Sequence, residues 1–430
     1  MIVARKSLSV LLSVVMLIAL VAGTVGASGA SDKKPSGAVV NLDFQQFWEV
    51  EVAPGALRAL MDKFESENPG IKVRLISAPY SNTKDQVIAS AATGTLSDVT
   101  ALMGTWLYDL VKANAVANLS EIMQKYNYDS SQIASMVKLG GKAYMINVCY
   151  GNYSLCINDD IFKKYGIAAP PKTWDEFIAV AKKTTDPAKN IYGFCLPISL
   201  EAANGIQNDV FSWLWADGGT ILKDGKPDLT NSGVKNTIQF IKSLWDQGLI
   251  APGAMSTTEA DKVAEFANGR YSMAIIAQGQ IEQIRMSKPD LKFTAVGFPV
   301  PAGSKMAPGD ILTCVPWGIG MSAKTKHPAE AWKLVEFIMS PKDNVTLSAL
   351  PNLFPGNKKS QADTSRMSPQ VKVVYDYFKN SKALMNELAG LPVSEELMRI
   401  FDEEFQACLN GSQTVDQMLQ KAQDRWMKNF

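Results

Sequence analysis

The stretch PGALRALMDKFESENPGIKVRL, residues 54–75, contains one helix, one stop signal and one strand. Apolar residues recur in it with the i, i+3, i+4, i+7 spacing of one buried helical face: Leu57, Leu60, Met61 and Phe64. The run Asn68-Pro69-Gly70 ends the helix. Apolar and charged residues then alternate over 71–75, which predicts a half-buried strand.

The same order of elements continues on both sides of this stretch. Residues 39–44 predict a first strand, and residues 83–93 predict a second helix that ends at Gly94. The short apolar run 99–102 predicts the next strand. Strands that alternate with helices in this way indicate βαβ units, so we expect an α/β fold with a largely parallel sheet.

A second group of elements follows Gly140-Gly141. Residues 144–157 are rich in apolar and aromatic side chains and predict two strands. Thr173 and Glu176 have the spacing of a capping box, which predicts a helix that begins there. The loop 303–310 contains Pro and Gly, and we expect the chain to cross between two lobes at this loop.

Length and composition agree with a globular protein of two lobes. The chain has 430 residues, of which 47% are hydrophobic and 20% are charged. A single core rarely serves a chain of this length, so two lobes of ordinary domain size are expected. The formal net charge is +1, and no block of basic residues stands out. We therefore expect no nucleic-acid partner.

The N-terminus has the order of regions that is typical of an export signal. Two basic residues precede an uncharged run over 8–22, and small residues follow it. This order predicts a secretory signal peptide over 1–27, with cleavage after Ala27 or, alternatively, Ala30. A retained membrane anchor is the other interpretation. Residues 28–37 predict a flexible lead-in, and without a cysteine after the apolar run we expect a periplasmic protein that has no lipid anchor.

The chain has five cysteines, and no pair of them has metal-site spacing: Cys149, Cys156, Cys195, Cys314 and Cys408. The first two fit either a bridge between two adjacent strands or two buried thiols.

Most signatures of catalysis are missing from the sequence. The only histidine, His327, precedes a predicted helix, and one histidine cannot supply a two-histidine zinc site. We find no nucleophile elbow, no Walker A loop and no dinucleotide fingerprint. We therefore expect a protein that is not an enzyme and that has no metal site and no cofactor.

Several tryptophans stand beside amides or glycines. Trp48, Trp106 and Trp317 lie at the ends of predicted strands, whereas Trp174, Trp245 and Trp332 have the spacing of packed helical residues. Ligands bind beyond the carboxyl ends of strands in open α/β sheets. Aromatic faces with amide and hydroxyl partners are typical of a pocket for a neutral, polyhydroxylated ligand.

Several segments together resemble one known family. They are residues 64–73, 92–99, 141–144, 156–162, 171–177, 267–274 and 317–333. In this order they resemble the bacterial extracellular solute-binding proteins of the carbohydrate-uptake type, the group that includes maltose-binding protein. The resemblance implies a two-lobed periplasmic-binding-protein type II fold with a ligand cleft between the lobes. We expect lobe 1 to comprise 38–145 plus 310–350, and lobe 2 to comprise 146–309 plus 351–430.

The resemblance also implies ten positions of ligand contact: Trp48, Thr105, Trp106, Asn152, Asn208, Phe211, Gln278, Gln280, Trp317 and Asn352. The family often has a tryptophan shortly after a glycine in the segment that holds Gly279, and this chain has Gln280 there. An amide in place of an aromatic platform leaves the identity of the sugar open.

The resulting hypothesis is capture by closure. The resemblance implies a monomeric substrate-binding component of an ABC importer that takes up a sugar, an oligosaccharide or a related polyol and delivers it to a permease in the inner membrane. Two alternatives remain at this stage. One is a binding protein for a charged solute such as a polyamine, an anion or a metal ion, and the other is a secreted carbohydrate-active enzyme.

Overall fold

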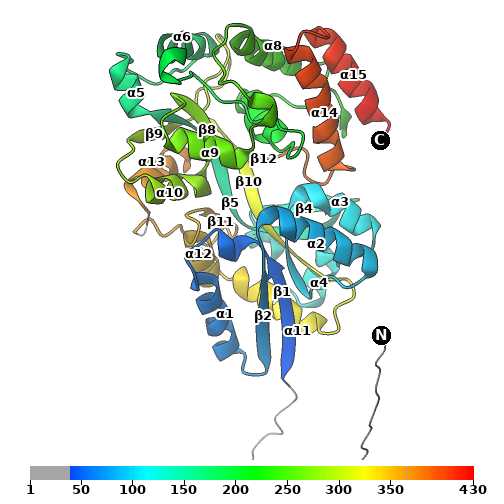
Figure 1. The fold of residues 1–430 in the computed structure, drawn as a ribbon. Helices are drawn as coiled ribbons and strands as arrows, with labels where there is room; N and C mark the ends of the chain where they lie inside the picture. Colours follow the sequence, from blue (N-terminus) through cyan, green and yellow to red (C-terminus); the bar gives the residue numbers. More distant parts are fainter. Residues whose placement is uncertain (1–38, 366) are drawn as a thin grey trace, which may run out of the picture. The chain divides into compact units, whose positions relative to one another are not determined.

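The computed structural model describes residues 39–365 and 367–430, and they fold into two lobes (Figure 1). The expected signal peptide and lead-in, residues 1–37, lie outside the described residues. Over the described ranges, no helix has the length and apolar character needed to cross a membrane.

Twelve strands are named in chain order: β1 (Val40–Gln46), β2 (Ile71–Ser77), β3 (Val99–Leu102), β4 (Met136–Leu139), β5 (Lys142–Asn158), β6 (Leu222–Lys223), β7 (Lys226–Pro227), β8 (Met273–Ala277), β9 (Phe293–Val296), β10 (Ile311–Met321), β11 (Phe354–Pro355) and β12 (Lys382–Met385).

The α-helices are α1 (Ala56–Glu67), α2 (Tyr80–Thr93), α3 (Gly104–Lys112), α4 (Leu119–Lys125), α5 (Asp159–Lys164), α6 (Trp174–Thr184), α7 (Ser212–Ala216), α8 (Ser232–Asp246), α9 (Glu259–Ala267), α10 (Gln278–Ser287), α11 (Pro328–Ile338), α12 (Pro341–Ala349), α13 (Pro369–Phe378), α14 (Ser394–Leu409) and α15 (Val415–Met427). Two shorter helical segments lie near the candidate functional site described below. They are the 3-10 helix Trp48–Val50 and the π-helix Ile206–Phe211.

The first βαβ unit forms as the sequence predicts. The apolar stripe of α1 is buried, and Asn68 ends the helix. β1 pairs in parallel with β2 on one side and with β3 on the other. The strand–helix alternation of the first hundred residues therefore produces the parallel half of the sheet.

The expectation of a largely parallel sheet is wrong beyond this unit. β5 pairs antiparallel with β4, β8, β9, β10 and β11, and β10 also pairs antiparallel with β3. The reason is that β5 and β10 are long neighbouring strands that run in opposite directions between the lobes (Figure 1).

Residues 144–157 form one strand, not the two that the sequence predicts. β5 continues without a turn from Lys142 to Asn158. Cys149 and Cys156 lie seven positions apart along this strand, a separation of roughly 23 Å at about 3.3 Å per residue. That is far beyond the reach of a disulfide. Of the two alternatives for this pair, the bridge is therefore wrong and the buried thiols are confirmed, and the other three cysteines are buried as well.

Each lobe has its own apolar core. The first core contains Leu42, Phe64 and Val148, together with Trp332 from α11. The second lobe buries two clusters, one centred on helices such as α8 and α14 and one beneath β8 and β9. Along β5, the side chains pass from the first core at Cys149 to the second lobe at Tyr153.

The chain crosses back between the lobes in β10. Leu312 and Cys314 pack in the second lobe, whereas Trp317 and Ile319 pack in the first core. The expectation that the loop 303–310 makes the crossing is therefore wrong, because Gly309 packs beside Gly297 and Tyr377 within the second lobe. The exact limits of the lobes stay a prediction.

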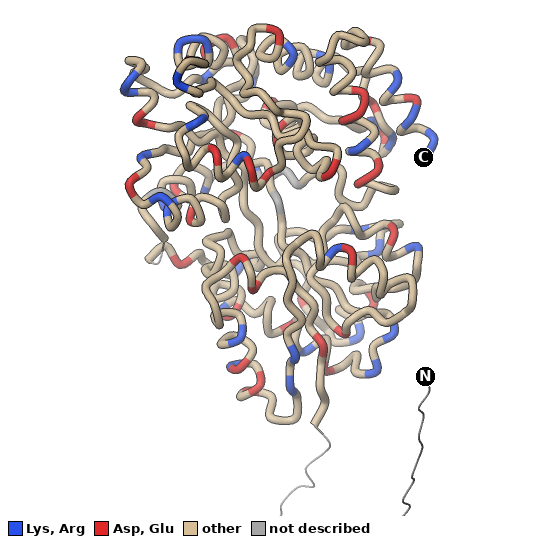
Figure 2. The backbone as a smooth tube through the Cα atoms, viewed as in Figure 1, with Lys and Arg blue, Asp and Glu red and all other residues tan. Residues whose placement is uncertain are grey.

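Local signals in the second half of the chain are confirmed. Thr173 caps α6, and Glu176 completes the capping box. His327 occupies the N-cap of α11, and Pro328 is its first residue. Acidic and basic residues are interspersed over both lobes (Figure 2). The described surface thus has the mixed charge that the near-neutral composition predicts.

Candidate functional site

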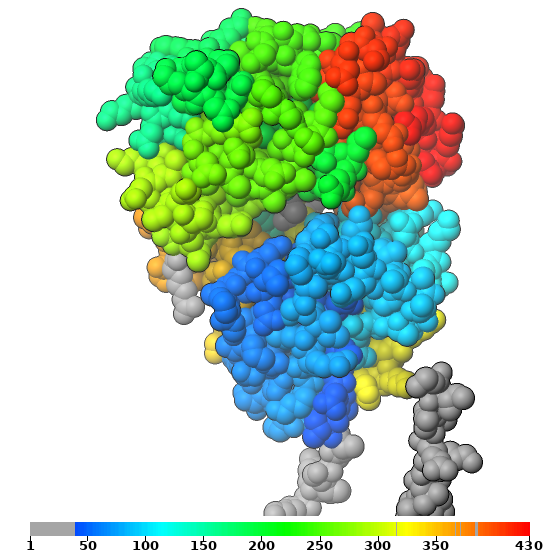
Figure 3. All heavy atoms as spheres, viewed as in Figure 1, coloured from blue at the N-terminus to red at the C-terminus, as the bar shows by residue number. Residues whose placement is uncertain are grey.

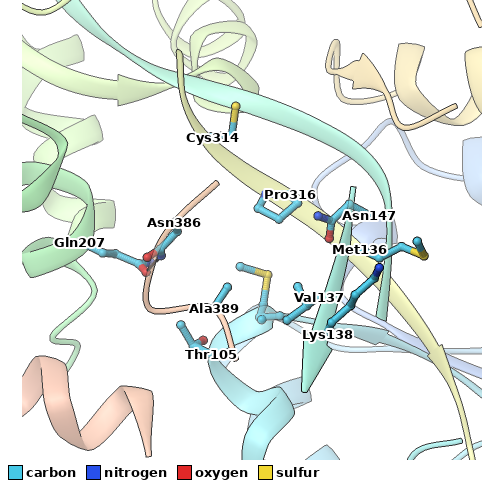
Figure 4. Close-up of a pocket in the computed structure, with 12 residues that line it drawn as sticks. Thr105, Met136, Val137, Lys138, Asn147, Gln207, Cys314, Pro316, Asn386 and Ala389 are labelled. Atoms are coloured by element: carbon cyan, nitrogen blue, oxygen red, sulfur yellow. Dashed lines mark hydrogen bonds between the residues drawn. The ribbon is translucent and has the colours of Figure 1, made fainter. Parts of the chain in front are cut away.

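A cavity of about 170 Å³ lies where β10 passes between the lobes (Figure 4). The first lobe contributes Thr105 from α3, residues 136–138 from β4, and Asn147 from β5. The second lobe contributes Gln207, and Pro316 of β10 lies between the two sides. The surface is visibly hollowed between the lobes in the space-filling view (Figure 3).

A π-helix presents the polar side chains of the second lobe. Residues 206–211 form this helix, which places Gln207 at the cavity. π-helices are rare and often occur at functional sites. Gly205 precedes it, and a Cβ added there would lie 1.7 Å from the carbonyl oxygen of Pro197. Glycine is therefore the residue that lets the chain enter the π-helix at this point.

The segment 386–390, between β12 and α14, forms another wall of the cavity. The amide of Asn386 donates a hydrogen bond to Oε1 of Gln207 (Figure 4). Farther along, the backbone N–H of Gly390 donates to the carbonyl of Gly104 over 2.9 Å. The segment therefore contacts residues of both lobes within five positions.

Glu387 ties this segment to the second lobe. Its carboxylate accepts hydrogen bonds from the indole N–H of Trp215 over 2.6 Å and from the backbone N–H of Ile221 over 2.9 Å. The hydroxyl of Thr220 donates to the same carboxylate. Three donors on one carboxylate hold the segment in place beside the cavity.

The predicted aromatic contacts of the first lobe form a packed cluster. The rings of Trp48 and Trp317 are stacked, with centroids 5.2 Å apart and an angle of 4° between their planes. Phe47 packs edge-on against both rings and against Trp106. The tryptophans are buried, so in this structure their faces contact protein.

Two of the three tryptophans lie where the sequence predicts. Trp48 follows β1 directly, and Trp106 lies in the first turn of α3 after β3. Trp317 is different, because it lies in the middle of β10 and not at the start of a strand. A register shift between Trp317 and Gly318 marks a bulge there, which local alternation does not reveal.

Glu51 stands next to this cluster. Its side chain is exposed, yet desolvation by neighbouring protein atoms raises the pKa of the carboxyl to about 7. A carboxyl on a concave surface can touch water on one side and still lose most of its hydration, which favours the neutral form. Glu51 is not among the ten predicted contacts, and its position three residues after Trp48 is the one signal for it in the sequence.

Asn208 and Gln280 meet at a shared carboxylate. Asn208 donates to Oε2 of Glu259 over 3.5 Å, and Gln280 donates to Oε1 over 3.2 Å. Gln280 thus occupies the position of the expected aromatic platform and is engaged in a polar network.

The network continues into a buried ion pair. The ammonium of Lys262 lies 2.9 Å from both carboxylate oxygens of Asp209 and 3.1 Å from Glu259. The side chains of Lys262 and Asp209 are fully buried. Burial raises the pKa of the Asp209 carboxyl, and Lys262 opposes this change. The ammonium therefore neutralises charge that would otherwise be buried without a partner.

The remaining predicted contacts lie apart from the cavity lining. Gln278 donates to the carbonyl of Asn352 over 2.5 Å, which joins α10 to the loop after α12. Asn152 donates to the hydroxyl of Ser154 over 2.6 Å along β5. Phe211 packs against Phe401 in the core of the second lobe, with ring centroids 4.7 Å apart.

Of the ten predicted contacts, Thr105 is the one that lines the cavity. Sequence reasoning missed Gln207, although it precedes the predicted Asn208, and it missed Asn386 entirely. The role of each predicted residue in ligand binding stays a prediction. Across residues 39–365 and 367–430, no three His, Cys, Asp or Glu side chains are grouped as a metal site.

Known protein families and known proteins include several that are similar to this chain. Residues 49–345 match the model of the family described as bacterial extracellular solute-binding protein. A binding protein of Brucella abortus (strain 2308) is 27% identical over 375 residues, which is 84% of this chain and 86% of that protein.

Two solved structures have the same fold. A solute-binding protein of an ABC transporter from Thermotoga lettingae, bound with α-D-tagatose, has a TM-score of 0.75 at 19% identity and covers 91% of this chain and 99% of its own. A maltose/maltodextrin-binding domain from Bdellovibrio bacteriovorus, bound to maltotriose, has a TM-score of 0.69 at 21% identity and covers 90% and 99%. At sequence identities of 19% and 21%, the two structures support the two-lobed fold and nothing more specific.

Proposed function

The chain belongs to the bacterial extracellular solute-binding protein family, and we propose that it is the substrate-binding component of an ABC importer for a sugar, an oligosaccharide or a related polyol. One observation carries this proposal. The cavity beside β10 is lined from both lobes by a hydroxyl and amides, those of Thr105, Gln207 and Asn386.

The chemistry of the lining suits a polyhydroxylated ligand. Amides both donate and accept hydrogen bonds, as sugar hydroxyls do, so burial of the ligand leaves few groups unpaired. The solved structures of the same fold that hold tagatose and maltotriose add support for this class of ligand.

The proposed mechanism is hinged closure. β5 and β10 run between the lobes, and the segment 386–390 contacts both of them. A ligand that contacts both sides of the cavity stabilises the closed arrangement over the open one. The permease then recognises the closed protein. Binding makes and breaks no covalent bond, so we propose that the chain acts as a binding protein and has no enzymatic activity. Export to the periplasm and a monomeric state belong to the same proposal.

A thermal-shift panel tests this function. Mature protein is heated with monosaccharides, oligosaccharides, polyols, amino acids and polyamines, each at about 100 times its dissociation constant where that is known. A ligand that binds only the folded state then adds about 2.7 kcal/mol, which raises Tm clearly. We expect a rise with members of one sugar or polyol series. A rise confined to charged solutes contradicts the proposal.

A matched pair of variants connects the binding to the cavity. Thr105→Val keeps the shape of the side chain and removes its hydroxyl, and we expect about a tenfold loss of affinity. Thr346→Val makes the same change at an exposed position of α12 and should leave affinity unchanged. Equal affinity in wild type and Thr105→Val would place the ligand elsewhere.

A further inference from the structure

The size of the cavity limits the ligand. The volume of the cavity is about 170 Å³, and the cavity is partly open to solvent. An apolar cavity of about 150 Å³ accommodates one benzene ring, whereas sites for drug-sized ligands have about 300–1,000 Å³. The volume therefore matches one ring with its substituents.

The walls on the side of the segment 386–390 are held by several contacts. A Cβ added to Gly104 would lie 2.5 Å from the Cβ of Ala389, so these two residues are already in close contact. The hydrogen bond from Gly390 to Gly104 closes the same side, and the donors on Glu387 hold the segment from behind. A longer ligand would have to break this set of contacts.

The aromatic rings give no row of platforms for further sugar units. Trp48 and Trp317 stack one face of each ring against the other, and both side chains are buried. Gln280 stands where an aromatic platform is expected, and its amide is bonded to Glu259. Among the described residues that line the cavity, none is aromatic, so the lining offers no stacking surface for a second sugar ring.

The polar groups of the lining are mainly neutral. Thr105 supplies a hydroxyl, and three side chains supply amides: Asn147, Gln207 and Asn386. None of the lining residues is an aspartate or a glutamate. Lys138 is the charged member, and its side chain is exposed. This set suits a neutral ligand whose hydroxyls take hydrogen bonds from opposite sides.

From these observations we infer that the ligand is a neutral monosaccharide or a polyol of similar size, and that the cavity rejects oligosaccharides. The inference rests on the proposed function, because it assumes that this cavity holds the transported solute. It narrows that function to one sugar unit per binding event.

The test is isothermal titration of wild-type protein with matched ligands. Pentoses, hexoses and hexitols form one arm, and the di- and trisaccharides built from the same units form the other. We expect one monomeric ligand to bind, and its disaccharides to bind at least about 100-fold more weakly, because the second ring overfills the cavity. Equal or tighter binding of the oligosaccharides overturns the inference and leaves the sugar-importer function standing. Binding of no carbohydrate at all overturns both.

Two variants show whether the titrated ligand occupies this cavity. Gln207→Ala removes an amide from the lining, and we expect about tenfold weaker binding of the monomeric ligand. Gln247→Ala removes an amide from the exposed end of α8 and should change nothing. Melting temperatures of both variants separate loss of binding from loss of fold. If Gln207→Ala melts like wild type and binds with unchanged affinity, the ligand lies elsewhere and the inference fails.

Discussion

The ammonium of Lys84 lies 2.9 Å from Oε2 of Glu395 and joins α2 of the first lobe to α14 of the second. The two side chains are 30% and 37% exposed, so the pair is partly hydrated. The residues are 311 positions apart, and no local pattern relates them. The contact is an ion pair between lobes that lies outside the cavity lining.

Reversing this charge should open the lobes. In Lys84→Glu, two carboxylates face each other, and a pair worth about 0.2–1 kcal/mol becomes repulsive. We expect a larger radius of gyration in small-angle X-ray scattering at low salt, and a smaller effect at high salt because of screening. The double variant Lys84→Glu with Glu395→Lys restores the attraction and should return the wild-type value. An unchanged radius in the single variant contradicts a role for this pair in holding the lobes.

Crowding at Gly104 should disturb the wall of the cavity. Gly104→Ala places a methyl group against Ala389, and overpacking of this kind costs about 1–3 kcal/mol. We expect lower stability in denaturant unfolding and weaker ligand binding. Ala389→Gly removes the opposing methyl, so the double variant should recover both properties in part. A single variant as stable as wild type would show that the segment 386–390 moves freely.

The buried ammonium of Lys262 should be essential for folding. Lys262→Met leaves Asp209 in the interior without its cation, and breaking a buried pair in this way costs about 3–5 kcal/mol. Lys242→Met is the control, because Lys242 pairs with the exposed Asp246 and such pairs contribute about 0–1 kcal/mol. Chemical denaturation measures both. Similar losses in the two variants would contradict the assignment of Asp209 as a charged partner.

Asp402 should make stability depend on pH. Its side chain is buried in α14, and desolvation raises the pKa of the carboxyl to about 7. A carboxyl with a raised folded pKa favours the folded state fully below the ordinary pKa of about 4, and this contribution is lost as the pH rises through about 7. Asp402→Asn keeps a neutral group at all pH values. We expect its Tm to exceed that of wild type at pH 8.5 by at least about 2 °C and to match it near pH 4.

The control for this pH dependence is Asp424→Asn, which changes an exposed carboxylate of α15. Its Tm relative to wild type should stay constant over the same pH range. A constant difference for Asp402→Asn as well would mean that the pKa of this carboxyl is the same in the folded and unfolded states, which contradicts the raised value.

Short-range signals predict the elements well and the crossing strands poorly. The stripe of α1 and the capping box of α6 depend on residues within one or two turns, and both form as expected. The sequence predicts two strands in place of β5, because Gly151 and Asn152 lie between two apolar runs. Pairing with β10 and β8 on either side keeps the backbone extended through them.

The site depends on contacts between residues that are far apart in the sequence, and this is why the sequence does not predict Gln207 and Asn386 as lining residues. Gln207 and Asn386 are 179 positions apart and meet at one wall. The sequence places Trp48 and Trp317 at strand ends, but their mutual stacking depends on the register of β10. Their contact with a ligand stays a prediction. A pattern in a single sequence identifies candidate side chains, whereas the lobe arrangement decides which of them share a surface.

The five buried thiols have a practical consequence for studying this protein. Burial raises the pKa of Cys149, Cys156, Cys195 and Cys408, and no cysteine is exposed. Maleimide reagents attack exposed thiolates, so the natural chain should remain unlabelled while it is folded. A single cysteine introduced at an exposed position such as Val50, which is 54% exposed, would then carry a fluorophore alone. The natural cysteines would therefore not need to be removed before the protein is labelled at one site with a fluorophore that reports ligand binding.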